Sequence, residues 1–270
     1  MWKVRGRLMS RKIVAIGGGE NGRQLSDGTN APYETYLMDK EIVDLVQKEK
    51  VNFLFLGHAQ PIHIQESYFH TMEKIYGDML GCECKILKSN ELDDIEKVKN
   101  LIAWADIIYE GGGDTLNMMQ EWRNAKFDKV LENAWNDGKV VCGVSAGGVC
   151  WFHSCNSDSL IIENGQSEEL TSVDCLNFIN AYCVPHCDEK GRYDSAKKEL
   201  KKNGLVGILL SNCAAIEIVD DSYRVIFTDA SHHKIEPYAK KAFWMDGNYY
   251  EYDIRNEKEF MPLSDLLKKE

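Results

Sequence analysis

The chain has 270 residues and a net charge of −11, with 44% hydrophobic and 28% charged residues, as in an ordinary globular protein. The acidic balance argues against nucleic-acid binding, because a nucleic-acid-binding protein presents a basic face. No apolar run approaches the roughly 20 residues of a membrane span. Nine cysteines with no C-x-x-C pair favour reduced thiols over disulfides or a metal site. Without a recognisable export signal, we expect a cytoplasmic protein.

Short β-branched runs alternate with amphipathic segments along the first half of the chain. Strands are expected at residues 13–16, 51–56, 82–87, 107–109 and 140–144, and helices at residues 33–48, 64–80, 92–104, 116–122 and 127–135. This alternation is typical of βαβ units and predicts an α/β fold, a three-layer sandwich with a mainly parallel sheet. Residues 1–11 are expected to be a disordered lead and residues 12–270 a single domain.

The last third of the chain has a different pattern. A strand is expected at residues 181–184, a charged helix at 193–202, and further strands at 205–210, 215–219 and 223–227. Turn residues at 220–222 and 246–248 predict antiparallel C-terminal hairpins at the sheet edge. Residues 264–269 read as a short terminal helix with Ser264 as its N-cap.

One serine stands in a turn that predicts a nucleophile. The apolar run of residues 140–144 leads directly into Ser145, within Gly143-Val-Ser-Ala-Gly147, and residues 149–152 are expected to begin an apolar helix. A strand, G-x-S-x-G and a helix form the nucleophile elbow, in which small neighbours let the backbone bend sharply. The alternative is a glycine-rich turn whose serine only caps the helix.

A serine hydroxyl needs a neighbouring base, and His186 is the best candidate. It follows the strand expected at residues 181–184, and the carboxyl ends of parallel strands carry the site in such sheets. His153 follows Ser145 too closely to face it well, and His232 and His233 lie in a polar turn.

The acid that would orient His186 is less well defined. Asp158 and Glu163 lie between the serine and the histidine, while Asp188 and Glu189 follow the histidine. We take Asp158 as the first candidate, and the other three carboxylates stay open.

Two more glycine clusters follow expected strands. Residues 111–113 precede a helix, so their amides could donate to an oxyanion, or the cluster is only a strand-to-helix turn. Residues 17–22 match the G-x-G-x-x-G pattern of dinucleotide-binding modules. That match is weak, because Asp39, the acidic residue at the appropriate spacing, falls inside a helical pattern instead of ending a strand.

Together these segments resemble the peptidase E family of serine peptidases, which includes aspartyl dipeptidases and, more distantly, cyanophycinases. The resemblance runs from about residue 12 to about residue 230 and rests on five motifs in order: Ile16-Gly-Gly-Gly19, Glu110-Gly-Gly-Gly-Asp-Thr115, Gly143-Val-Ser-Ala-Gly147, Asp158-Ser-Leu-Ile-Ile162 and Val184-Pro-His186. It implies a flavodoxin-like or class I glutamine amidotransferase-like sandwich without a metal or cofactor.

The resemblance also implies roles for individual residues. The nucleophile falls on Ser145 and the base on His186, with Asp158 as the acid and Glu163 as its alternative. The oxyanion donors would be amides of Gly112, Gly113 and Ala146. Arg192 lies near the position of the arginine with which aspartyl dipeptidases hold the substrate's N-terminal aspartate, but it does not clearly coincide with that position.

The sequence therefore predicts a serine hydrolase that cleaves small peptides through an acyl-enzyme. Two alternatives stay open: an esterase or amidase on the same elbow, and a non-enzymatic nucleotide-binding module using residues 17–22. The expected partner is a small peptide, with no nucleic acid and no membrane, and a homodimer is left open.

Overall fold

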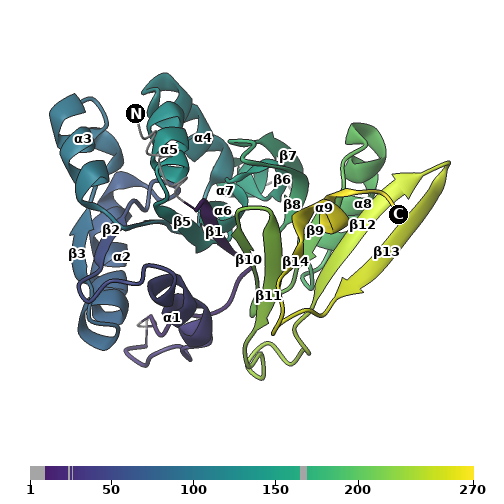
Figure 1. Cartoon of the computed structure of the whole chain (residues 1–270), viewed down its shortest axis with the longest axis horizontal. Coiled ribbons are helices and arrows are strands. Elements are labelled where there is room, and N and C mark those ends of the chain that lie inside the picture. Colours follow the sequence, from purple (N-terminus) through teal and green to yellow (C-terminus); the bar gives the residue numbers. More distant parts are fainter. Residues whose placement is uncertain (1–9, 24, 26, 165–168) are drawn as a thin grey trace, which may run out of the picture.

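The structure, a computed structural model, describes residues 10–23, 25, 27–164 and 169–270, with only the backbone described at residues 163 and 164. Within these ranges the strands form two sheets, of eight and six strands (Figure 1). The lead expected at residues 1–11 lies outside the described residues, apart from its last two positions. The first strand, β1 (Lys12–Ile16), begins directly after it.

The larger sheet has the order β14-β11-β10-β1-β5-β4-β2-β3. Its parallel pairs join β1, β5 (Val140–Val144), β4 (Ile107–Glu110), β2 (Asn52–Phe55) and β3 (Glu83–Ile86). Its antiparallel pairs add β10 (Ala214–Val219), β11 (Ser222–Phe227) and β14 (Met261–Pro262). The carboxyl ends of the parallel strands therefore share one edge, where the loops that follow them meet.

Helices cover both faces of the larger sheet, because its central strands carry apolar side chains on both sides. Along β1, Ile13 and Ala15 belong to one apolar cluster, and Val14 and Ile16 belong to another. The first cluster includes side chains of α3 (Ile95–Trp104), α4 (Thr115–Asn124) and α5 (Phe127–Asn136). The second includes side chains of α1 (Tyr36–Asp44), α2 (Ile62–Glu73) and the π-helical segment η1 (Lys74–Met79). A short 3-10 turn, η2 (Ser89–Glu91), precedes α3.

The smaller sheet has the order β13-β12-β9-β8-β6-β7. Its members are β6 (Phe152–Ser157), β7 (Thr171–Asp174), β8 (Ile179–Val184), β9 (Gly207–Leu210), β12 (Ala239–Met245) and β13 (Asn248–Ile254). Only the β6–β8 and β8–β9 pairs are parallel in this sheet, as far as the described residues go. The charged helix α8 (Arg192–Asn203) packs on it through Ala196 and Leu200. The α7 helix (Ser159–Asn164) connects β6 with β7.

The α/β class is confirmed, and the larger sheet contains the expected parallel strands. The second sheet was not expected: β6, β7, β8, β9, β12 and β13 build it, while β10, β11 and β14 join the larger sheet. The apolar helix expected from residue 149 is wrong: α6 (Ala146–Val149) is one turn long, and β6 follows almost at once. The aromatic residues Trp151 and Phe152 directly after the turn favour a strand there.

The C-terminal hairpins are confirmed. β10 pairs with β11 across the turn at residues 220–221, and β12 pairs with β13 across residues 246–247. The β12–β13 hairpin forms the end of the molecule opposite α3 and β3 (Figure 1). The terminal helix α9 (Leu263–Leu267) begins one residue earlier than expected, so Pro262 and not Ser264 occupies the N-cap.

One apolar cluster contains side chains of both sheets, for example Val141 of β5 and Ile208 of β9. A shared core of this kind accords with one domain over residues 12–270, which stays a prediction. None of the helices in the described ranges combines the length and the apolar character that a bilayer crossing requires.

Candidate active site

Ser145 occupies a sharp turn between β5 and α6. Its φ and ψ are 55° and −118°, a strained conformation for a residue with a side chain. Its amide donates to the carbonyl of Ile16 on the neighbouring strand β1 at 2.9 Å. Gly147 packs so closely on β4 that a Cβ there would lie 2.0 Å from the carbonyl oxygen of Glu110. These backbone contacts fix the bend and present the hydroxyl at the edge of the sheet.

His186 follows β8 and reaches this serine. Its Nε2 lies 2.9 Å from Ser145 Oγ, and its side chain is 19% exposed. The backbone at His186 also has a positive φ of 48°, and its amide donates to the carbonyl of Gly17 at 3.1 Å. The histidine is therefore held against the loop that follows β1, in hydrogen-bonding contact with the serine.

Asn212 is the partner of the second ring nitrogen. Its Oδ1 lies 2.8 Å from His186 Nδ1, and its Nδ2 donates to Asp188 Oδ2 at 3.0 Å. Because Asp188 is an acceptor only, the carboxamide must direct its oxygen at the ring. His186 Nδ1 then donates, which leaves Nε2 to accept from the Ser145 hydroxyl. Glu189 Oε1 is more distant, 3.4 Å from Nδ1, and its side chain is 51% exposed.

Asp158 and Arg192 pair with each other instead of serving the positions expected for them. Arg192, at the start of α8 and only 4% exposed, donates to Asp158 Oδ2 at 2.8 Å. The place beside His186 predicted for Asp158 is occupied by Asn212, and Arg192 is not among the residues that line the cavity at the serine. Both expectations are corrected by this ion pair, in which the Arg192 side chain is buried and the Asp158 side chain is partly exposed. The side chain of the alternative acid, Glu163, lies outside the described residues.

The glycine loop at residues 111–113 lies beside the serine, as expected. A Cβ at Gly112 would lie 3.3 Å from Ser145 Cβ, and the carbonyl of Gly112 accepts from Gln60 Nε2 at 2.7 Å. The Gly112 amide makes a long contact, 3.4 Å, to the Tyr68 hydroxyl. In the described part of the chain, no hydrogen bond engages the amides of Gly113 and Ala146. Those two amides are free to donate to a ligand.

A buried carboxyl group supports this loop from behind. Glu110 is fully buried, and its Oε1 accepts from the amides of Ala59 and Gly111, both at 3.1 Å. Burial raises the pKa of Glu110 to about 8, since the charged form loses its hydration. The side chain therefore joins the loops after β2 and β4 largely in its neutral form.

A cavity of about 1000 Å³ opens in front of Ser145. Its polar lining includes Asn21, Arg23, Gln60, Tyr68, His70 and Lys74. Arg23 makes a two-pronged ion pair with Glu20, at 3.0 and 3.1 Å. The cavity offers both hydrogen-bond donors and acceptors to a polar ligand.

The glycines of residues 17–22 have a structural explanation other than nucleotide binding. A Cβ at Gly18 would lie 2.2 Å from Asn212 Oδ1 and 2.4 Å from His186 Nδ1. The next helix, α1, begins only at Tyr36, whereas in a dinucleotide-binding motif the glycines lie at the start of a helix. The close approach of Gly18 to the histidine accounts for the small residue.

Comparison with known proteins identifies the family. The model of peptidase family S51 matches residues 24–226. The chain belongs to peptidase family S51. The predicted resemblance to the peptidase E family is thereby confirmed, and this S51 chain is a peptidase whose substrates are peptides.

Relatives of the S51 chain carry the same description. It is 28% identical over 217 residues to the uncharacterized peptidase YgaJ of Bacillus subtilis strain 168, covering 78% of this chain and 84% of that protein. The crystal structure of a peptidase from an acI-B1 Actinobacterium matches with a TM-score of 0.65 and 19% identity, over 94% of this chain and 98% of that one. A Listeria monocytogenes EGD-e protein, named provisionally as a peptidase E, matches with a TM-score of 0.56 and 18% identity, over 82% and 100%.

Asn212, Gln60 and Tyr68 of the S51 chain were not predicted from its sequence. A polar interruption between two apolar strands, Ser211-Asn-Cys213, was the available signal for Asn212. Gln60 and Tyr68 carry no motif, and only the packing of α2 against the loop after β4 brings them to the site.

Proposed function

We propose that this peptidase is a serine peptidase that hydrolyses small peptides through an acyl-enzyme, with Ser145 as nucleophile, His186 as base and Asn212 as the residue that positions the histidine. The observation that carries the proposal is the 2.9 Å contact between Ser145 Oγ and His186 Nε2. The positive φ at both residues supports it, since backbone strain concentrates at functional sites.

The reaction follows from these positions. His186 Nε2 takes the hydroxyl proton as Ser145 Oγ bonds to the scissile carbonyl carbon. The carbonyl oxygen becomes an oxyanion, and the amides of Gly113 and Ala146 donate to it. The imidazolium then protonates the leaving amine. Water attacks the acyl ester while His186 takes its proton, and Ser145 is regenerated with release of the carboxylic acid.

Asn212 differs from a carboxylic acid in the charge that it presents to His186. Its oxygen accepts from Nδ1–H and so fixes the tautomer, but a neutral amide offers no full charge to the imidazolium. Asp188 supplies a negative charge one hydrogen bond further away, since its carboxylate accepts both the Nδ2 and the main-chain amide of Asn212, the latter at 2.7 Å. A hydrogen-bonded chain polarises its members, so Asp188 strengthens Asn212 as an acceptor.

The substrate class rests on the cavity and not on Arg192. Because Asp158 neutralises Arg192 away from the cavity, that arginine does not support specificity for an N-terminal aspartate. Arg23, which lines the cavity as Lys74 does, is itself paired with Glu20. We therefore propose small peptides without commitment to an acidic first residue.

Labelling with an active-site serine reagent tests the proposal. A fluorophosphonate should modify the wild-type protein at Ser145, and Ser145→Ala should abolish both labelling and peptide turnover while leaving the fold intact. Ser67→Ala is the matched control, because Ser67 lines the same cavity but its hydroxyl donates to a helix carbonyl, that of Ile64. Turnover by Ser145→Ala at the wild-type rate would end the proposal.

To decide the substrate class, the rates of hydrolysis of a panel of dipeptides are compared with those of short-chain esters. Faster hydrolysis of dipeptides supports the proposal. Turnover of esters alone would assign the same elbow to an esterase.

A further inference from the structure

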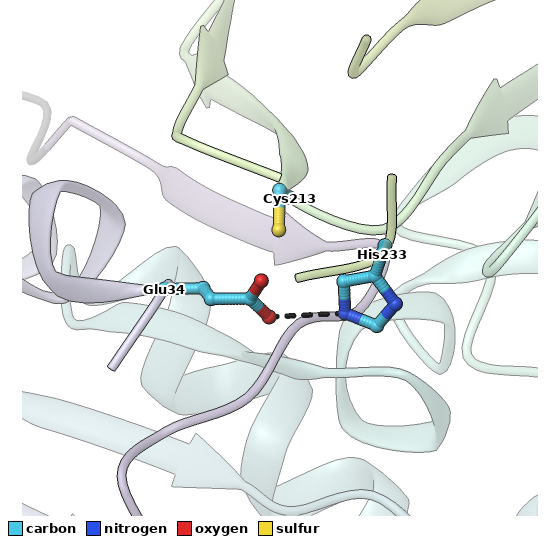
Figure 2. Close-up of side chains that lie close together, drawn as sticks. All are labelled: Glu34, Cys213 and His233. Carbon is cyan, nitrogen blue, oxygen red and sulfur yellow. Dashed lines mark hydrogen bonds and ion pairs between the residues drawn. The ribbon is translucent and has the colours of Figure 1, made fainter. Parts of the chain in front are cut away.

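Three side chains from distant segments meet at the residue that follows Asn212 in the chain: Glu34, Cys213 and His233 (Figure 2). Glu34 precedes α1, Cys213 precedes β10, and His233 lies in the loop between β11 and β12. One donor atom from each lies within 4.8 Å of the other two. Figure 2 shows the carboxylate and the imidazole facing each other, with the thiol directed toward them from above.

The carboxylate of Glu34 is only partly satisfied. The residue is 8% exposed, and its Oε2 accepts from the amide of Glu20 at 2.8 Å and lies 3.0 Å from His233 Nε2. Its Oε1 is buried and has no hydrogen-bond partner among the described residues. A buried carboxylate oxygen without a partner is costly, and a cation is the ligand that would satisfy it.

We propose that Glu34, Cys213 and His233 form a zinc site. Thiolate, imidazole and carboxylate together are ligands typical of Zn²⁺. At Zn–S and Zn–N lengths of about 2.3 and 2.0 Å, tetrahedral ligands lie roughly 3.5 Å apart. Glu34 Oε2 and His233 Nε2 are already 3.0 Å apart, and no separation in the cluster exceeds 4.8 Å, so small movements of the side chains suffice. His233 can supply this movement because its loop side chain is 25% exposed. Three protein ligands leave the fourth position of the ion to water or another ligand.

The location gives the site a consequence for the protein. Cys213 directly follows Asn212, and the amide of Cys213 donates to the carbonyl of Gly18 at 2.9 Å. Glu34 accepts from the amide of Glu20, which lines the cavity. Zinc would therefore tie the loop after β1 and the β11–β12 loop to the segment that carries Asn212. The proposal stands independently of the peptidase chemistry, because it concerns metal binding alone.

Metal binding to the full chain, stripped with a chelator, tests the site without reference to activity. Titration with Zn²⁺ against a chromogenic chelator should give one equivalent bound. Co²⁺ in its place should give the intense near-ultraviolet absorption of a thiolate–cobalt bond. We expect His233→Gln and Glu34→Gln to weaken Zn²⁺ binding at least about tenfold, and Cys213→Ser to abolish the thiolate–cobalt absorption.

Matched variants keep the test specific. His232→Gln changes the exposed neighbouring imidazole, and Cys84→Ser changes a partly exposed thiol on the edge strand β3, outside the cluster, so both variants should bind Zn²⁺ as the wild type does. His233→Gln lies on a loop, so its folding, checked by circular dichroism, should be unaffected even where the buried Cys213→Ser is not. Absence of stoichiometric binding, or binding that survives His233→Gln unchanged, would overturn the proposal.

Discussion

At the scale of single residues, the contact between Asn212 and His186 governs how the base is held. Asn212→Ala removes the acceptor for Nδ1–H, so the imidazole loses its fixed tautomer and orientation. We expect kcat to fall about 10²-fold, within the range of general acid–base effects, with a smaller change in KM. Steady-state kinetics on the best dipeptide measures both.

An exchange of amide and acid tests the same chain of hydrogen bonds more sharply. Asn212→Asp alone places two carboxylates about 3 Å apart, and like charges at that distance resist joint ionisation, so activity should fall. The double variant Asn212→Asp/Asp188→Asn restores one acid and one amide and should recover most of the loss. Glu189→Gln, at the more distant and exposed carboxylate, should change kcat less than about threefold. Equal rates for the single and double variants would contradict the proposed role of the hydrogen-bonded chain from Asp188 through Asn212 to His186.

At the scale of elements, the loop after β1 supports His186 because Gly18 in this loop packs directly against the imidazole ring. Gly18→Ala would introduce a Cβ within 2.4 Å of the His186 ring and 2.2 Å of Asn212 Oδ1. Both side chains would have to move, which breaks their hydrogen bond, so we expect a loss of at least about 10²-fold in kcat/KM. Gly77→Ala on η1 is the control, because its Cβ would meet only an ordinary contact at 3.4 Å. Equal activity of the two variants would show that the loop is not a support.

At the scale of the whole molecule, Glu110 makes stability depend on pH. Its pKa is about 8 in the folded protein and ordinarily near 4.5, so between these values the folded state holds a proton that the unfolded state releases. The free energy of unfolding should therefore fall as pH rises through this window, by at most about 1.4 kcal/mol per pH unit. Asp39 is also buried, and its pKa is raised to about 6, so it adds to the loss of stability in the lower part of this pH range.

Urea denaturation at several pH values between 5 and 8 measures this slope. Glu110→Gln keeps an oxygen for the amides of Ala59 and Gly111 and carries no charge, so its stability should vary less with pH. Glu96→Gln, on the exposed face of α3, should keep the wild-type slope. The assignment to Glu110 fails if its variant and the wild type share one slope.

The sequence by itself determined the features that local patterns encode. Alternating apolar runs specify the parallel strands and their helices, and the small residues around Ser145 specify the bend, because backbone geometry depends on near neighbours. His186 could be found in the same way, since it comes two residues after the end of an apolar strand. Only the tertiary structure decided which residue bonds to His186 Nδ1. Asn212 comes from another segment of the chain, and Asp158 forms an ion pair with Arg192 instead. For the same reason the cluster of Glu34, Cys213 and His233 could not be predicted from the sequence. Its members are far apart in the chain and match no metal-binding spacing, and only the packing of three loops brings them together.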